Sequence, residues 1–143
     1  MKKVLFTLLV ACVSVLSWAE TPIVGDWKTV DDETGETMSI VTIYKGTDGM
    51  YYGKVAQVLK GSPDAVCTKC EGEDHNKPIK GLHIIRGMKL EDGELRGGTV
   101  LDPNNGKTYY AKMYLKDGKL VLRGSLDKRG LFGRNQTWLP AGK

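Results

Sequence analysis

The sequence predicts an all-β protein built as one antiparallel up-and-down β-barrel of about eight strands. Apolar and aromatic runs recur along the chain between short turn signals rich in Gly, Asp and Asn, as is typical of strands joined by hairpins. No segment repeats apolar residues at the i, i+3, i+4, i+7 spacing of an amphipathic helix. We therefore expect strands, and no long helix.

The predicted strands follow one another closely along the chain. Asp92-Gly93 and Asp117-Gly118 supply the positive φ that tight hairpins require. A meander of this kind favours a barrel over a sandwich, because sandwiches usually need longer crossings and closure removes exposed edges. The expected strands occupy residues 25–30, 38–44, 50–59, 82–89, 95–101, 108–115, 119–126 and 133–139.

Alternating side chains in two of these runs indicate which residues face the barrel interior. Period-2 spacing places every second residue on the same face of a strand. Both faces keep apolar residues, which suits a barrel with a packed or ligand-lined interior. The residues that share a face are Tyr109, Ala111, Met113 and Leu115 in one run, and Leu120, Leu122, Gly124 and Leu126 in the next.

The first 19 residues have the form of a secretory signal peptide. Lys2 and Lys3 precede an apolar run that is too short to span a bilayer, and cleavage is expected after Ala19. This predicts a domain over residues 20–143, either periplasmic or secreted, with no transmembrane segment after processing. The alternative is a lipoprotein anchored at Cys12, which the apolar residues after Cys12 disfavour.

The charge balance of the processed chain is nearly neutral. Removing Lys2 and Lys3 from the 21 basic residues leaves 19, against 17 acidic residues. Such a mixed surface shows no electrostatic footprint for nucleic acid or for an anionic membrane. The sequence does not indicate an oligomeric state.

A structural plug is expected where the first and last strands meet. Gly25 and Trp27 form a Gly-x-Trp at the start of the domain, and Arg134 lies in the last predicted strand. In small barrels such a tryptophan closes one end beneath an arginine, through a cation–π contact. Arg123 is the second candidate for that arginine. The pattern resembles that of lipocalins.

A closer resemblance covers nearly the whole processed chain. In order, the segments GDWKTVDDETGE, YYGKV, CTKCEGE, KPIKGLHII, GGTVLDPNNGKTY, KLVLRG and GRNQTW resemble the DUF2147 family of small exported bacterial proteins. The resemblance implies a lipocalin-like barrel in the periplasm. It implies no settled activity.

Cys67 and Cys70 are the two cysteines that remain after processing. We expect a disulfide that ties a loop, because the compartment permits it. A redox pair is an alternative, although the flanking residues do not predict a helix and nearby acids would raise a thiolate pKa. A metal site of Cys67, Cys70 and His75 is the other alternative, and it lacks a fourth ligand.

The segment from residue 61 to residue 80 is long for a loop without a strand. Loops of that length are usually functional or disordered, and a disulfide argues against disorder. Two interpretations remain open. The loop is either a lid over one mouth of the barrel or an excursion into solvent.

The sequence contains no recognisable catalytic set. It has no Gly-x-Ser-x-Gly, and two histidines are the only candidate bases of that type, so we predict a protein that is not an enzyme and uses no cofactor. The expected function is binding of a small apolar or amphipathic ligand inside the barrel. The alternative is a structural or interaction protein of the bacterial envelope with a filled barrel. The candidate ligand-binding residues are Tyr44, Tyr52, Tyr109, Met113 and Trp138.

Overall fold

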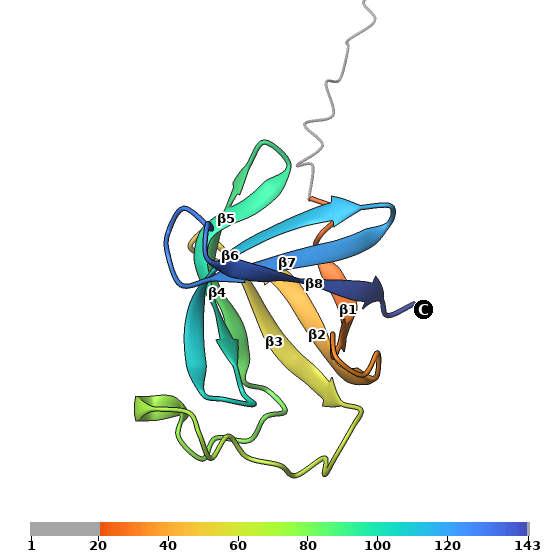
Figure 1. The fold of residues 1–143 in the computed structure, drawn as a ribbon, viewed down its shortest axis with the longest axis vertical. Helices are drawn as coiled ribbons and strands as arrows, with labels where there is room; N and C mark the ends of the chain where they lie inside the picture. Colours follow the sequence, from red (N-terminus) through yellow and green to blue (C-terminus); the bar gives the residue numbers. More distant parts are fainter. Residues whose placement is uncertain (1–20, 143) are drawn as a thin grey trace, which may run out of the picture.

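The computed structural model describes residues 21–142, which form eight strands and one short 3₁₀ helix (Figure 1). The predicted signal peptide and Cys12 lie outside the described residues. Within residues 21–142 no helix is long and apolar enough to cross a membrane. The elements are β1 (Gly25–Val30), β2 (Thr37–Lys45), β3 (Tyr51–Val58), η1 (Gly72–Asp74), β4 (His83–Glu91), β5 (Glu94–Asp102), β6 (Lys107–Lys116), β7 (Lys119–Ser125) and β8 (Gly133–Pro140).

The eight strands form a closed barrel in which each strand pairs antiparallel with its neighbours in the sequence. Closure comes from β1 and β8, which pair only at Trp27 with Pro140 and at Lys28 with Leu139. The predicted fold class is therefore confirmed, and each predicted strand begins and ends within two residues of an observed one.

Two hairpins show how the turn residues set this topology. Asp92 and Gly93 join β4 to β5 with φ values of 50° and 79°, and Asp117 and Gly118 join β6 to β7 with 53° and 75°. Two successive positive φ values are those of a type I′ turn, whose twist matches that of paired strands. The Asp-Gly pairs predicted as turns thus fix the register of these strands.

A dense core fills one end of the barrel, which we call the closed end. This is the end where the N-terminal residues Thr21–Val24 enter β1 and where β2 turns into β3. The inward side chains there are large, and they have no exposed surface: Ile23, Ile43, Ile85, Met88, Leu95, Met113 and Leu120. This core is the main source of hydrophobic stabilisation.

Strands β4 and β5 approach each other closely at Gly98. A Cβ at Gly98 would overlap the carbonyl oxygen of Arg86 and lie 2.5 Å from Sδ of Met88. Gly87 and Gly97, on the same two strands, have positive φ values of 64° and 79°. These glycines therefore provide the bends and close backbone contacts expected where a small barrel curves.

Candidate functional site

The other end of the barrel holds a cavity of about 790 Å³, which we call the barrel cavity. Its mouth lies between the β1–β2 loop, the β5–β6 turn and the loop that joins β7 to β8. The cavity and the closed end divide the interior between them, because none of the seven fully buried side chains of the closed end lines the cavity. The barrel is thus half filled.

The floor of the barrel cavity is apolar. Trp138 of β8 is 2% exposed and forms part of this floor, and Gly124 of β7 is a small inward position nearer the mouth, opposite Arg134. Water bound to such a surface has few polar partners, so its replacement by an apolar group is favourable. The remaining apolar floor residues are Val55, Ile84, Val100 and Leu122.

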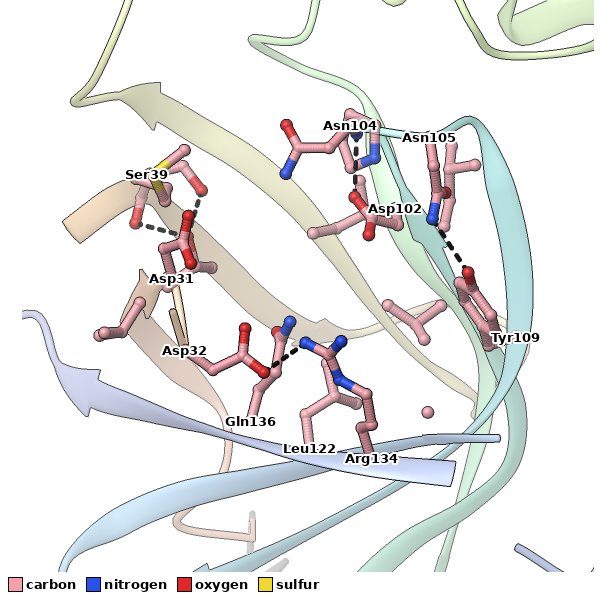
Figure 2. A pocket seen from close by; sticks show the side chains of 18 of the residues that line it. Asp31, Asp32, Ser39, Asp102, Asn104, Asn105, Tyr109, Leu122, Arg134 and Gln136 are labelled. Carbon is pink, nitrogen blue, oxygen red and sulfur yellow. Dashed lines mark hydrogen bonds and ion pairs between the residues drawn. The ribbon is translucent and has the colours of Figure 1, made fainter. Parts of the chain in front are cut away.

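The rim of the barrel cavity is polar and carries both charges. Asp32 of the β1–β2 loop and Arg134 of β8 form an ion pair across the mouth, and Figure 2 shows the two side chains pointing toward each other. On the opposite wall, Asn105 donates a hydrogen bond of 2.9 Å to the hydroxyl of Tyr109. The other charged rim residues are Asp31, Glu33, Lys60, Asp102 and Lys107.

The mouth widens because β1 and β8 separate there. Beyond Lys28 and Leu139 the two strands share no ladder pairs, so Thr29 of β1 and Gln136 of β8 face the cavity instead of each other's backbone. Thr29 bonds to Ser39 of β2 through their hydroxyl groups, 2.8 Å apart. The ion pair of Asp32 with Arg134 is then the side-chain link across this seam.

The segment between β3 and β4 is ordered and docks beside the mouth, below the strands in the view of Figure 1. A Cβ at Gly106, in the β5–β6 turn, would overlap the carbonyl of Lys69, so the loop lies directly on that turn. Within residues 61–80, the cavity lining includes Ile79 alone. The loop therefore forms part of the wall and does not cover the mouth in this structure.

Cys67 and Cys70 form the predicted disulfide, with Cα atoms 5.4 Å apart. The cysteines are 1% and 2% exposed, and Val66 pairs with Pro78 to close the loop behind them. His75 is turned toward the chain, with Nδ1 3.0 Å from the carbonyl oxygen of Cys70. In this state neither cysteine offers a thiolate to a metal.

The burial of Cys67 and Cys70 also argues against the alternative of a redox pair. Thiol exchange needs a sulfur that an incoming thiol can reach, and a reactive cysteine usually sits at a helix N-terminus or near positive charge. Cys67 and Cys70 offer no such access because both side chains are buried, and the helical element that follows Cys70, η1, has only three residues. We therefore interpret the disulfide as structural.

The five predicted ligand-binding residues fall into three places. Tyr109 and Trp138 line the barrel cavity. Met113 faces inward, but it is completely buried in the closed end. Tyr44 and Tyr52 lie on the outer surface of β2 and β3, where they line a shallow groove, so these two are not positioned to bind a ligand inside the barrel.

The outer groove holds polar groups that are paired with one another. Nε2 of His83 is 2.7 Å from the hydroxyl of Tyr44, and Tyr52 donates a hydrogen bond to Asp48. That bond lowers the pKa of Asp48 and raises the pKa of Tyr52. Burial lowers the pKa of His83, and the charge of Arg86 lowers it further, so His83 is neutral at pH 7.

The salt bridge beside this groove attaches the cysteine loop to the barrel wall. Asp74, at the end of η1, accepts a hydrogen bond of 2.9 Å from Arg86 of β4. Burial raises the pKa of Asp74, but the hydrogen bonds and charges of Arg86 and Lys77 outweigh that effect, so the pKa lies below its ordinary value. The side chains of Tyr44, Tyr52, Asp74, His83 and Arg86 are thus paired within the protein, and among the described residues no buried side-chain polar atom lacks a partner.

Trp27 is buried as the sequence predicts, but the group that contacts its indole is not the predicted arginine. Trp27 is 7% exposed, and its indole N–H donates a hydrogen bond of 2.8 Å to the carbonyl of Ile23. Gly25 adopts φ 137°, which suits glycine and lets the chain turn Ile23 back over the indole. The predicted arginine cover does not form, because Arg134 pairs with Asp32, and Arg123 bonds to the carbonyl of Gly130 and to Asn135.

The sequence analysis missed most of the cavity floor. Lys54 is polar and exposed, which marks its face of β3 as the outer one and places Tyr52 on that face. The opposite face, with Tyr51, Gly53 and Val55, is the inner one, and Val55 lines the cavity. The alternation within β3 therefore contained the signal that separates the two tyrosines.

Comparison with known proteins gives one family and one fold. Residues 25–139 match the family described as "Uncharacterized protein conserved in bacteria (DUF2147)". A solved structure, described as "Protein HP1028 from the human pathogen Helicobacter pylori belongs to the lipocalin family", superposes with a TM-score of 0.75. The two chains are 21% identical over 87% of this chain and 86% of the other, a likeness that shows the lipocalin-like fold. No curated protein matches the chain.

Proposed function

Because the chain belongs to the DUF2147 family and folds as a lipocalin-like barrel, we propose that it binds one small hydrophobic or amphipathic molecule in the barrel cavity. The observation that carries the proposal is the cavity itself. Its volume of about 790 Å³ falls within the range of small-molecule sites, roughly 300–1,000 Å³. A filled barrel, as the envelope-protein alternative requires, would leave no such space.

The distribution of polarity inside the cavity indicates the class of ligand. Trp138, Leu122 and Val100 provide an apolar floor, whereas Asp102 and Arg134 belong to a charged rim. A molecule with an apolar chain and a polar head satisfies both regions, since the chain leaves water and the head stays at the solvated mouth. We therefore propose an amphipathic ligand such as a fatty acid or a single-chain lipid, bound chain first.

Gly124 offers a direct test of the cavity as the binding site. A Cβ at this position would lie 3.6 Å from Cβ of Tyr109 and 3.7 Å from Cγ1 of Val100, which are ordinary contact distances. Gly124→Phe should therefore place a ring inside the cavity and obstruct it without disturbing the backbone, whereas Gly124→Ala should leave most of the cavity open. We expect Gly124→Phe to weaken binding of the fluorescent fatty acid cis-parinaric acid by roughly tenfold or more, or ~1.4 kcal/mol.

The measurement is a fluorescence titration on both variants and the unmodified protein, together with thermal unfolding to show that each variant is folded. Native mass spectrometry of protein purified from the producing cells tests the same proposal without a chosen probe. The proposal fails if the folded Gly124→Phe variant binds the fatty acid as tightly as the Gly124→Ala variant. It also fails if the unmodified protein neither carries a co-purified small molecule nor binds the probe.

A further inference from the structure

The loop between β7 and β8 exposes three large apolar side chains at the mouth of the barrel cavity. We call residues 126–132 the docking loop. Leu126, Leu131 and Phe132 are 73%, 67% and 72% exposed, the highest values among the large exposed apolar side chains of the described residues. Three such side chains on one short loop form an apolar patch rather than scattered single residues, and such patches mark interaction sites.

Hydrogen bonds hold the docking loop in this shape. The carboxylate of Asp127 accepts bonds from the backbone N–H groups of Leu131 and Phe132, at 3.1 and 2.9 Å. Nε of Arg123 donates to the carbonyl of Gly130 at 2.7 Å, and the hydroxyl of Ser125 donates to the carbonyl of Asp127 at 2.8 Å. The backbone is thus fixed by its own polar groups, and the apolar side chains are left projecting into solvent.

The charges on the docking loop favour an anionic partner. Lys128 and Arg129 are exposed, and among the ion pairs of residues 21–142 neither one takes part. The single acid of the loop, Asp127, is engaged with backbone N–H groups. Although the processed chain is nearly balanced in charge, the free charge of this loop is positive. Apolar side chains beside free cations are the combination that binds an anionic lipid surface.

The position of the docking loop relates that surface to the cavity. Leu126 and Phe132 both line the barrel cavity at its mouth, and β8 leads from the loop to Arg134 at the open seam with β1. We propose that the docking loop inserts Leu131 and Phe132 into an anionic bilayer surface and so places the mouth of the barrel cavity against the lipid. This goes beyond ligand binding, because it assigns a surface from which the molecule is taken or to which it is delivered.

Vesicle co-sedimentation of the protein produced from its complete sequence tests the proposal without any ligand. The vesicles contain phosphatidylglycerol and phosphatidylcholine in equal parts, and vesicles of phosphatidylcholine alone serve as the neutral reference. All variants carry the same N-terminal residues, so differences between them report on the loop. The matched control is Leu90→Ser, which removes an exposed leucine from β4, outside the docking loop.

We expect the unmodified protein and Leu90→Ser to bind the anionic vesicles equally and to bind neutral vesicles more weakly. Leu131→Ser combined with Phe132→Ser should reduce partitioning by roughly tenfold or more. Lys128→Gln combined with Arg129→Gln should reduce it by about tenfold, and added salt should weaken binding in the unmodified protein. Thermal unfolding should stay unchanged in both variants because the altered side chains are exposed.

Three results would overturn the proposal. One is a double variant, Leu131→Ser with Phe132→Ser, that sediments with anionic vesicles as well as the unmodified protein does. The second is an unmodified protein that binds neither kind of vesicle. The third is a concentration-dependent dimer without vesicle binding that the same double variant dissolves, which would assign the patch to a second copy of the chain. Loss of fatty-acid binding alone leaves the docking proposal standing, so the two proposals fail independently.

Discussion

Trp27 tests whether the closed end of the barrel is the source of its stability. The side chain is 7% exposed, and its indole N–H bonds to the carbonyl of Ile23, a residue with no exposed surface. Trp27→Ala would remove a buried ring and leave both a void and an unpaired carbonyl. Truncation of a core tryptophan costs about 3–5 kcal/mol, and the lost hydrogen bond is included in that figure at about 1 kcal/mol.

Trp27→Phe separates the two contributions. Phenylalanine keeps much of the apolar contact but cannot donate to Ile23, so we expect this variant to lose about 1–2 kcal/mol. The assay is urea unfolding followed by circular dichroism, with thermal unfolding as a second measure. For a domain of this size the alanine variant should melt roughly 10 °C lower or more. An exposed leucine changed to alanine, Leu90→Ala, provides the reference for a substitution without a structural role.

One result would refute this reasoning. If Trp27→Ala changed the free energy of unfolding by less than about 1 kcal/mol, the indole would not be packed as described, because surface substitutions usually stay within about 0.5 kcal/mol. A variant that lost fatty-acid binding while keeping its stability would also count against the division of the barrel into a closed end and a cavity.

Two further predictions concern the loops at the open end. Replacing Cys67 and Cys70 with serine should cost about 2 kcal/mol in the chain-entropy model, since the bridge closes a very short ring; complete unfolding in urea-free buffer would show instead that the disulfide holds the fold. The second prediction concerns Asp127. Its carboxylate accepts a hydrogen bond from the backbone N–H of Phe132, and this bond keeps the pKa of Asp127 below its ordinary value, although partial desolvation acts in the opposite direction. A lowered folded-state pKa stabilises the loop above the ordinary value near 3.9 and loses that effect as pH falls through the folded value. Hydrogen exchange at the amides of Leu131 and Phe132 should therefore speed up in that acidic range, and Asp127→Asn should change how the exchange rate depends on pH. An exchange profile that does not change with pH, after correction for intrinsic rates, would contradict this prediction.

The fold was predictable because the local signals agree with one another. Asp92-Gly93 and Asp117-Gly118 dictate hairpins, and the alternation at Tyr109, Ala111 and Met113 correctly identifies an inward face. Short connections then leave few topologies, and closure follows from the need to pair the edges. None of these inferences requires knowledge of how far along the barrel a residue lies.

The ligand-binding site was predicted less well, because a residue's position along the barrel axis decides whether it lines the cavity. Met113 and Tyr109 share an inward face, yet Met113 is buried in the closed end and Tyr109 lines the cavity. The alternation of side chains within a strand shows which residues face inward, but it does not show how far along the barrel each of them lies. The partner of Arg134 was also beyond reach, because Asp32 is about a hundred residues away in the sequence and meets Arg134 only through the closure of the barrel.

The half-filled interior follows from the sizes of the inward side chains. At the closed end, large inward residues such as Met88, Leu95 and Met113 have no exposed surface, so the interior there is filled. At the other end the inward positions include Ser39 and Gly124, whose side chains are too small to meet. The seam between β1 and β8 widens at that end as well. A barrel that concentrates its core at one end retains stability while keeping a cavity. Of the three loops that border this cavity, the docking loop exposes large apolar side chains. The separation explains why changes at Trp27 should affect stability, whereas changes at Gly124 and in the docking loop should affect binding.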